Sequence, residues 1–384
     1  MKLFECQHCG QPLYFENTHC ESCERKLGYM PEREIMTALE SDHGVWRALA
    51  DDARYNYCAN ADHGVCNWLI PAESTERFCV ACRHNRTIPN LSQPDNLINW
   101  RKIEIAKHRL FYTILKLHLP HKTRVEDPEH GLAFDFLNPQ DAPLGEPIMT
   151  GHDSGVITIN LAEADDSERE RRRREMREPY RTLLGHFRHE IAHYYWDRLV
   201  RGSPSIAEFR ELFGDERQDY AAALNRHHAN GPPPDWPEQF VSAYASMHPW
   251  EDFSETWAHY FHMVDTLETA GAFGLRVKPK ISKGRDLAAN IDFDPHLATM
   301  ERIIDAWLPL TFAVNSVNRS MGIADLYPFV LSPLAIMKLS FVHAQVHDAT
   351  RSNRAGVTPE EGDRGTLGAV IAGLRRSVGP PEVI

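Results

Sequence analysis

His189, Glu190 and His193 form the pattern His-Glu-x-x-His, whose spacing suits a single metal ion. Two histidines four residues apart lie one above the other on a helix, so both imidazoles can reach the same zinc ion. Glu190 follows the first histidine, where its carboxylate can take a proton from zinc-bound water. Residue frequencies alone give about 0.1 accidental matches in a chain of this length, so the pattern needs support from its surroundings.

The segment around this pattern predicts an amphipathic helix. Its apolar residues recur at helical spacing and form one stripe: Leu183, Leu184, Phe187, Ile191 and Tyr195. His189 and His193 fall off this stripe, on a face that also carries His186 and Asp197. A helix that is simply buried would not gather titratable groups on one face. We therefore predict a catalytic zinc site on this helix.

A catalytic zinc site needs a third protein ligand and one open position. Trp196 and Leu199 stand where the metzincin arrangement would have glycine and histidine, so that arrangement is excluded. A later helix beginning near Trp250 supplies carboxylates instead. We expect Glu251 to bind the zinc and Glu255, one turn further on, to hydrogen-bond a ligating histidine. The alternative is that Glu255 is the ligand.

All eight cysteines lie within the first 82 residues, in two groups. The first group contains two Cys-x-x-Cys pairs: Cys6, Cys9, Cys20 and Cys23. The second group is less regular: Cys58, Cys66, Cys79 and Cys82. For the second group, a mixed site using His63 is one alternative, and ordinary buried thiols at Cys58 and Cys66 are another. Four thiolates leave zinc no open position, so we predict two structural zinc sites.

The elements that carry these motifs predict an α+β fold. Residues 1–30 should form a zinc ribbon, and residues 31–90 a helical connector at 32–57 followed by the second cysteine module. After a linker at 87–96, residues 97–348 should form a mainly helical domain with a small mixed or antiparallel sheet. Its strands are expected at 131–137 and 156–161, and its helices include 100–117, 298–317 and 332–347. The strand at 156–161, as an edge strand, would pair with an extended substrate.

Composition limits the class of protein. The 384 residues are 42% hydrophobic and 25% charged, which is typical of a soluble globular chain. The best apolar stretch, 328–342, is interrupted by Ser332, Pro333 and Lys338, so no membrane span is expected. The chain lacks the apolar core of a secretory signal at its start, which favours a cytoplasmic location. A formal net charge of −12 argues against general affinity for nucleic acid.

Two further segments are charged or irregular. The run at 167–177 is densely charged, with consecutive arginines at 171–174 and glutamates interleaved around them, and it predicts a solvated helix. A contact with nucleic acid is the alternative. The tail at 349–384 is rich in arginine, glycine and proline, and we expect it to be flexible.

The combined motifs resemble a known family. His-Glu-x-x-His followed by a helix with Glu-x-x-x-Glu resembles the gluzincin branch of the zincin metallopeptidases. Two longer runs are similar to those of bacterial zinc-binding metallopeptidases that carry an N-terminal zinc ribbon: Glu-Pro-Tyr-Arg-Thr-Leu-Leu-Gly-His-Phe-Arg-His-Glu and His-Pro-Trp-Glu-Asp-Phe-Ser-Glu-Thr-Trp-Ala-His-Tyr. The resemblance covers nearly the whole chain, and it implies a zincin-like fold and hydrolysis of peptide bonds.

The resemblance also implies a role for one tyrosine. Lethal-factor-type gluzincins place a tyrosine seven residues before the third ligand, and Tyr244 has this spacing before Glu251. The Tyr244 hydroxyl would then hydrogen-bond the tetrahedral oxyanion. The alternative is an aromatic ring that only packs.

These residues and the resemblance together predict a zinc metallopeptidase. One catalytic and two structural zinc ions are expected, with a peptide or protein as substrate and a protein partner at the zinc ribbons. Neither nucleic acid nor a membrane is an expected partner. The alternative function is a zinc-ribbon binding or regulatory protein, in one variant associated with nucleic acid, whose zincin domain recognises a partner.

Overall fold

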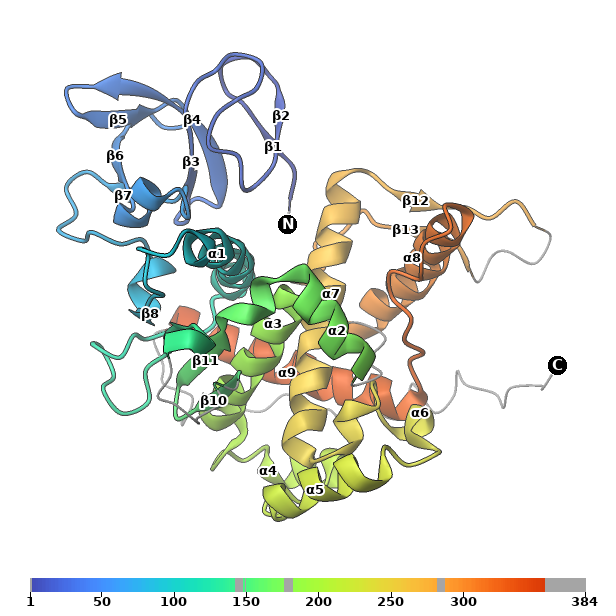
Figure 1. The fold of residues 1–384 in the computed structure, drawn as a ribbon. Helices are drawn as coiled ribbons and strands as arrows, with labels where there is room; N and C mark the ends of the chain where they lie inside the picture. Colours follow the sequence, from blue (N-terminus) through green and yellow to red (C-terminus); the bar gives the residue numbers. More distant parts are fainter. Residues whose placement is uncertain (1, 142–147, 149, 176–181, 282–286, 356–384) are drawn as a thin grey trace.

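The N-terminal part of the chain is built from short antiparallel strands (Figure 1). The computed structural model describes residues 2–141, 148, 150–175, 182–281 and 287–355. A hairpin of β1 (Phe4–Glu5) and β2 (Pro12–Leu13) comes first. An antiparallel sheet then follows in chain order: β3 (Leu27–Met30), β4 (Ile35–Asp42), β5 (Val45–Ala48), β6 (Arg54–Tyr57) and β7 (Leu69–Pro71). This sheet curls back on itself, because Tyr29 of β3 bridges to Trp68 just before β7.

The predicted helix at 32–57 is wrong, because this segment forms β4, β5 and β6. Between β4 and β5, His43 and Gly44 have positive φ angles of 49° and 93°, as a tight two-residue hairpin turn requires. Met36 and Ala38 pack into the main core, whereas Leu39 packs into a smaller apolar cluster. Because both faces of β4 bury apolar residues, their spacing imitates that of a helix.

A second, mixed sheet has the strand order β10–β11–β9–β8. It consists of β8 (Asn85–Thr87), β9 (Ala133–Leu137), β10 (Gly151–Asp153) and β11 (Val156–Asn160). Strands β8 and β11 run parallel to β9, while β10 is antiparallel to β11. The predicted strands at 131–137 and 156–161 are therefore present. The expectation that the strand at 156–161 lies at an edge is wrong, because β10 pairs with it and is itself the edge strand within the described residues.

Helices make up most of the remaining described chain (Figure 1). The α-helices are α1 (Pro94–Lys116), α2 (Asp166–Glu175), α3 (Leu183–Tyr195), α4 (Ile206–Phe213), α5 (Tyr220–Asn230), α6 (Trp236–Gln239), α7 (Pro249–Ala272), α8 (Met300–Ser320) and α9 (Pro333–Ala355). Short 3-10 turns occur at η1 (Ala59–His63), η2 (Cys82–His84), η3 (Pro139–Asp141), η4 (Leu161–Ala164) and η6 (Tyr244–Ser246), and η5 (Trp196–Val200) is a π-helical turn. The strands β12 (Arg276–Val277) and β13 (Ala289–Asn290) form a small antiparallel pair.

One core runs through both parts of the molecule. A single cluster of buried apolar side chains extends from Phe4 and Tyr29 in the N-terminal strands to Val346 in α9. The predicted α+β architecture, mainly helical behind two four-cysteine groups, is confirmed. Helix α9 continues to Ala355, so the predicted flexible tail cannot begin at 349, and residues 356–384 lie outside the described residues. No helix of the described chain is long and apolar enough to cross a membrane.

Candidate active site

Helices α3 and α7 pack side by side and form the framework of the site (Figure 1). Helix α3 begins after Thr182, whose side chain accepts a hydrogen bond from the N–H of Gly185 at 3.0 Å. The apolar face of α3 is buried, and Tyr195 stacks on Trp257 of α7 with ring centroids 5.0 Å apart. Because that face is buried, His189 and His193 lie on a different face of α3, where both are close to Glu251 of α7.

The start of α7 places a carboxylate opposite these histidines. His248 caps the helix by accepting the N–H of Trp250 at 3.2 Å, and Pro249 occupies the first helical position. Glu251 therefore lies in the first turn, where the helix dipole favours a negative charge. Although burial opposes ionisation, His193 and His189 lower the pKa of Glu251 to about 2. Glu251 is thus held as a buried carboxylate.

The three predicted ligands converge on one point. His189 Nε2 lies 2.9 Å from one Glu251 oxygen, and His193 Nε2 lies 3.6 Å from the other. Donors bound to one tetrahedral zinc ion at 2.0–2.1 Å would be separated by about 3.4 Å. Glu251 Oε2 is buried and accepts no hydrogen bond from the described residues. Two imidazoles and a buried carboxylate oxygen that lies close to one of them without a well-aligned hydrogen bond therefore fit a zinc ion.

Each histidine is also held at its other ring nitrogen. His189 Nδ1 donates to Glu255 Oε1 at 2.8 Å, and Ser242 donates to the second oxygen of Glu255 at 2.6 Å. Ser254 lies 3.1 Å from His193 Nδ1. Because Glu255 is on the far side of the His189 ring from Glu251, the geometry favours Glu251 as the ligand. Such partners fix the orientation of a metal-binding imidazole.

The two histidines differ in their electrostatic surroundings. Burial lowers the pKa of His193 to about 3, which keeps its ring neutral, as a metal ligand must be. Burial acts in the same direction on His189, but the carboxylates of Glu251 and Glu255 outweigh it and raise the pKa of His189. This difference in pKa arises from Glu251 and Glu255 of α7, so the His-Glu-x-x-His spacing alone could not predict it.

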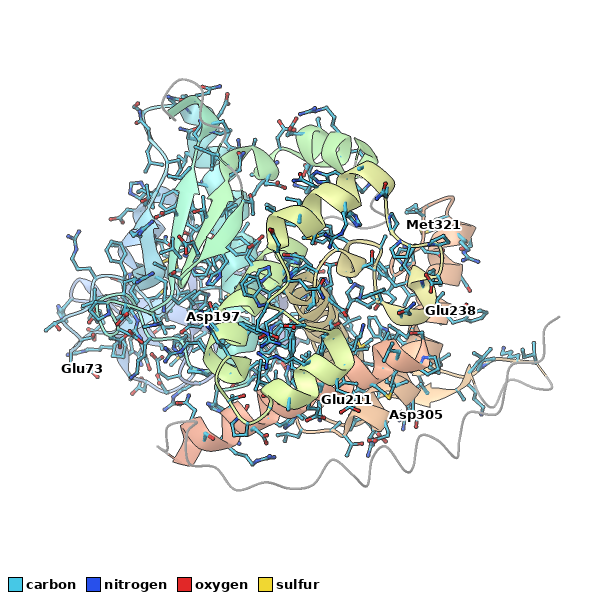
Figure 2. The ribbon with its side chains drawn as sticks, turned by 90° about the horizontal axis from the view of Figure 1, so that it is seen from below. Glu73, Asp197, Glu211, Glu238, Asp305 and Met321 are labelled. Atoms are coloured by element: carbon cyan, nitrogen blue, oxygen red, sulfur yellow. The ribbon has the colours of Figure 1, made fainter. Side chains whose placement is uncertain are left out.

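A cavity of about 410 Å³ opens beside the three predicted ligands. Its lining includes residues of the edge strand β10, α3, the η5 and η6 turns and the starts of α5 and α7: Gly151, His152, Asp153, His189, Glu190, His193, Trp196, Asp197, Tyr220, Tyr244, Trp250 and Glu251. Asp197 is labelled in Figure 2, on the segment that directly follows α3. Glu190 is 8% exposed and borders this cavity. The predicted base and ligands therefore share one cavity.

Two cavity residues, His152 and Tyr220, were missed by the sequence analysis. The ring of His152 lies parallel to that of His193, with centroids 6.2 Å apart. Tyr220 donates a hydrogen bond to Glu251 Oε1 at 2.9 Å. No motif marks either residue, because each reaches the site only through tertiary packing. The predicted Tyr244 also lies here, with its ring 6.0 Å from that of His189.

The eight cysteines form two compact groups of sulfur atoms. In the first group, Cys6 and Cys23 are 3.8 Å apart and Cys9 and Cys20 are 3.5 Å apart. The four donors of each group lie within 4.8 Å of one another. Sulfur atoms around one tetrahedral zinc ion would be about 3.8 Å apart, so both groups fit zinc.

The alternative of a mixed site at the second group is not supported. His63 is not among the clustered donor atoms of the described residues. Its ring lies instead against Trp100, with centroids 5.9 Å apart.

Comparison with known proteins identifies the family of this chain. Residues 96–345 match a family model described as "Putative zinc-binding metallo-peptidase". The chain belongs to this family. Residues 3–93 of this metallopeptidase family member match a zinc-ribbon domain model, which confirms the predicted combination of the two.

The relatives of this family member cover nearly its whole length. The uncharacterized protein Rv2568c of Mycobacterium tuberculosis is 44% identical over 352 residues, which is 91% of this chain and 96% of the relative. The uncharacterized protein Mb2598c of Mycobacterium bovis has the same identity and coverage. No solved structure matches the chain. The metallopeptidase model spans His189, His193 and Glu251, whereas the ribbon model spans all the cysteines.

Proposed function

We propose that this protein is a zinc-dependent peptidase whose active site is built by α3 and α7. The observation that carries this proposal is the convergence of His189, His193 and Glu251 beside a cavity that also holds Glu190. Three protein ligands next to an open cavity are typical of catalytic zinc sites, whereas structural sites are closed by four. The family match supports the same reaction class.

Each residue has a defined role in this proposal. Zinc, when bound, would supply Lewis-acid polarisation of the scissile carbonyl and would make water a stronger acid. Glu190 would accept the proton of the attacking water and pass it to the leaving amine. Tyr244 would donate a hydrogen bond to the oxyanion that develops on the carbonyl. Burial and nearby Glu251 raise the pKa of Tyr244, so its hydroxyl stays protonated and can donate.

The edge strand β10 is the proposed substrate-binding element. Gly151, His152 and Asp153 line the cavity, and β10 pairs through one side with β11. An extended peptide could add to the other side through main-chain hydrogen bonds. This proposal keeps the predicted mode of substrate binding but moves it from the strand at 156–161 to β10.

The test is Glu190→Gln in the zinc-loaded full-length protein. Cleavage of a broad panel of unfolded proteins and peptides is expected to fall by about 10²–10⁴-fold, the contribution of general acid–base catalysis. Catalytic zinc should be retained, because Glu190 is not a ligand. Glu211→Gln on α4 is the control, since Glu211 (labelled in Figure 2) is not among the cavity residues. A wild-type protein that cleaves no member of the panel would contradict the proposal.

A further inference from the structure

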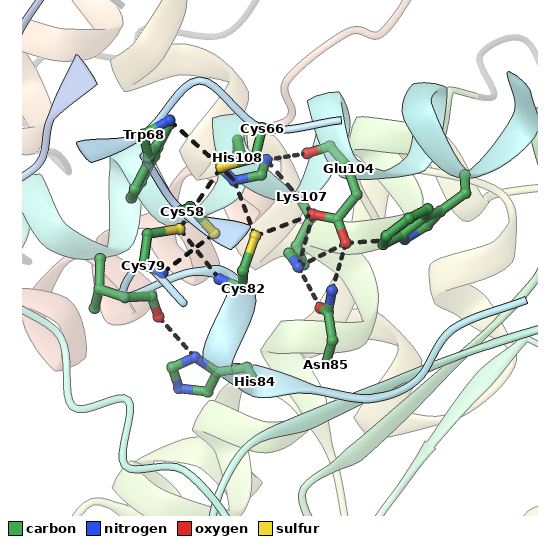
Figure 3. A network of polar contacts seen from close by, with 12 residues as sticks. Cys58, Cys66, Trp68, Cys79, Cys82, His84, Asn85, Glu104, Lys107 and His108 are labelled. Carbon is green, nitrogen blue, oxygen red and sulfur yellow. Dashed lines mark hydrogen bonds and ion pairs between the residues drawn. The ribbon is translucent and has the colours of Figure 1, made fainter. Parts of the chain in front are cut away.

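Helix α1 buries three ionisable side chains against the second cysteine group (Figure 3). Glu104 and Lys107 are fully buried, and His108 is 5% exposed. All three belong to the segment matched by the metallopeptidase model, whereas the cysteines belong to the ribbon match. Buried ionisable groups are rare unless they have specific partners. Their partners therefore indicate what this junction does.

His108 is fixed with one ring nitrogen facing two sulfur atoms. Its Nδ1 donates to the backbone carbonyl of Glu104 at 2.7 Å, since a carbonyl can only accept. Its Nε2 lies 3.4 Å from Cys66 Sγ and 3.6 Å from Cys82 Sγ. The ring also packs against Trp68, with centroids 4.9 Å apart. Figure 3 shows Nε2 of His108 turned toward the sulfur atoms.

Glu104 is not available as a metal ligand, although it lies near Cys82 and His108. Lys107 Nζ is 2.8 Å from Glu104 Oε2 and 3.0 Å from Oε1. Asn85 and Trp100 donate to Oε1 at 2.6 Å and 3.1 Å. A second cation at this carboxylate would face the ammonium group of Lys107, which repels it. Glu104 and Lys107 instead form a buried ion pair, without net charge, next to His108.

The sulfur atoms need hydrogen-bond donors when zinc is bound. One zinc ion with four thiolates has a net charge of minus two, and burying such a charge is costly unless donors compensate it. Backbone N–H groups supply part of the compensation: that of Trp68 to Cys66 at 3.4 Å, of Cys79 to Cys58 at 3.3 Å, and of Cys82 to Cys79 at 3.4 Å. His108 faces Cys82, which receives none of these three bonds.

We propose that His108 is a positioning residue of the second zinc centre. With both ring nitrogens protonated, its imidazolium donates from Nδ1 to the Glu104 carbonyl and from Nε2, as an N–H···S hydrogen bond, to the negatively charged thiolates of Cys66 and Cys82. The four cysteines remain the ligands, and His108 holds two of them from outside. Helix α1 thereby retains the metal of the ribbon part. This role does not depend on the proposed peptidase activity.

The test uses full-length protein with ¹¹³Cd in place of zinc, so that each centre gives its own NMR signal. In wild type, we expect a proton on His108 Nε2 that couples to ¹¹³Cd through sulfur. After addition of a chelator, His108→Ala should lose metal from the second centre about 10- to 100-fold faster, the usual effect of removing such a partner. The first cysteine centre is an internal control and should release metal at an unchanged rate.

Two variants separate this role from general packing. His108→Gln keeps a side-chain N–H and should give an intermediate rate, and it replaces His108→Ala if that variant does not fold. His84→Ala is the matched control, because His84 is equally buried beside the centre but its ring nitrogens face the carbonyls of Val80 and His121. Equal acceleration in His84→Ala would overturn the proposal. So would an unchanged rate in both His108 variants, or a direct ¹¹³Cd–¹⁵N coupling showing that His108 is a ligand.

Discussion

At the scale of single residues, two tyrosines beside the same carboxylate should have separable roles. Tyr220 hydrogen-bonds Glu251, whereas Tyr244 lies over His189 at the cavity. A contact with a ligand affects how tightly the metal is held. A hydroxyl directed at the substrate affects the chemical step instead.

Tyr244→Phe should lower kcat by about 10²–10³-fold, the usual effect of removing one oxyanion donor. The catalytic zinc content should not change, because Tyr244 does not contact a ligand through a hydrogen bond in the proposed arrangement. Steady-state kinetics and metal analysis on the same preparation measure both quantities. A variant that keeps wild-type kcat would show that Tyr244 only packs.

Tyr220→Phe should instead weaken the affinity of the catalytic site for zinc by about 10-fold or more, because Glu251 loses the hydrogen bond that orients it. Competition with a chromophoric chelator measures this affinity. At saturating zinc, kcat should recover. A kcat that stays low under zinc saturation would place Tyr220 in the chemical step.

The sequence is informative for residues that share one helix and silent about residues that meet across elements. His189 and His193 are one turn apart, so their common face follows from helix geometry alone. The position of Glu251 near these histidines could be predicted because Glu251 and Glu255 are also four residues apart on one helix, as His189 and His193 are. Tyr220, His152 and Ser254 could not be predicted, since their partners are set by the packing of α5, β10 and α7.

At the scale of elements, β4 shows where periodicity fails. An amphipathic helix and a strand buried on both faces can have similar apolar spacing, and the tight turn decides between them. His43 and Gly44 were the available signal, because a turn with two positive φ angles favours glycine at its second position. Helices α1 and α3 were predictable because each buries one apolar stripe.

The loop before α8 joins α7 through a charged network that should respond to pH. Buried His296 lies 3.1 Å from Asp294 in its own loop and 3.8 Å from Asp265 of α7. Burial opposes its charge, but these carboxylates outweigh burial and raise the pKa of His296 to about 9. Glu268 of α7 also raises it. Arg188 of α3 pairs with Asp265, and His347 of α9 lies near enough to interact with His296.

This network predicts a loss of stability as pH rises. The unfolded pKa of histidine is about 6.5, so the stabilisation by charged His296 is fully present below that pH and disappears as pH rises through about 9. The loss should be on the order of 3 kcal/mol in wild type and should be absent in His296→Gln. Urea unfolding between pH 6 and 10 measures it, with His43→Gln at an exposed hairpin turn as the control. Parallel profiles in wild type and His296→Gln would contradict this assignment.

At the scale of the whole molecule, the three groups of ligands predict a metal count. Native mass spectrometry of wild type should show three zinc ions per chain, and His189→Ala should show two. His186→Ala is the matched control with an expected count of three, because His186 lies on the same helix but faces Glu163 at 3.3 Å. An unchanged zinc count in His189→Ala would contradict the assignment of the active site.

Strand β8 belongs to a sheet whose other strands come later in the chain, and this has a consequence for biosynthesis. On the ribosome, residues through Thr87 emerge before β9 and α1, and N-terminal segments generally begin to fold first. The cysteines of the nascent ribbon part can then come together before β9, the partner of β8, has been synthesised. Until β9 arrives, that strand has an unpaired edge open to association with other chains. Between the synthesis of these two segments, the chain therefore carries a strand whose partner does not yet exist.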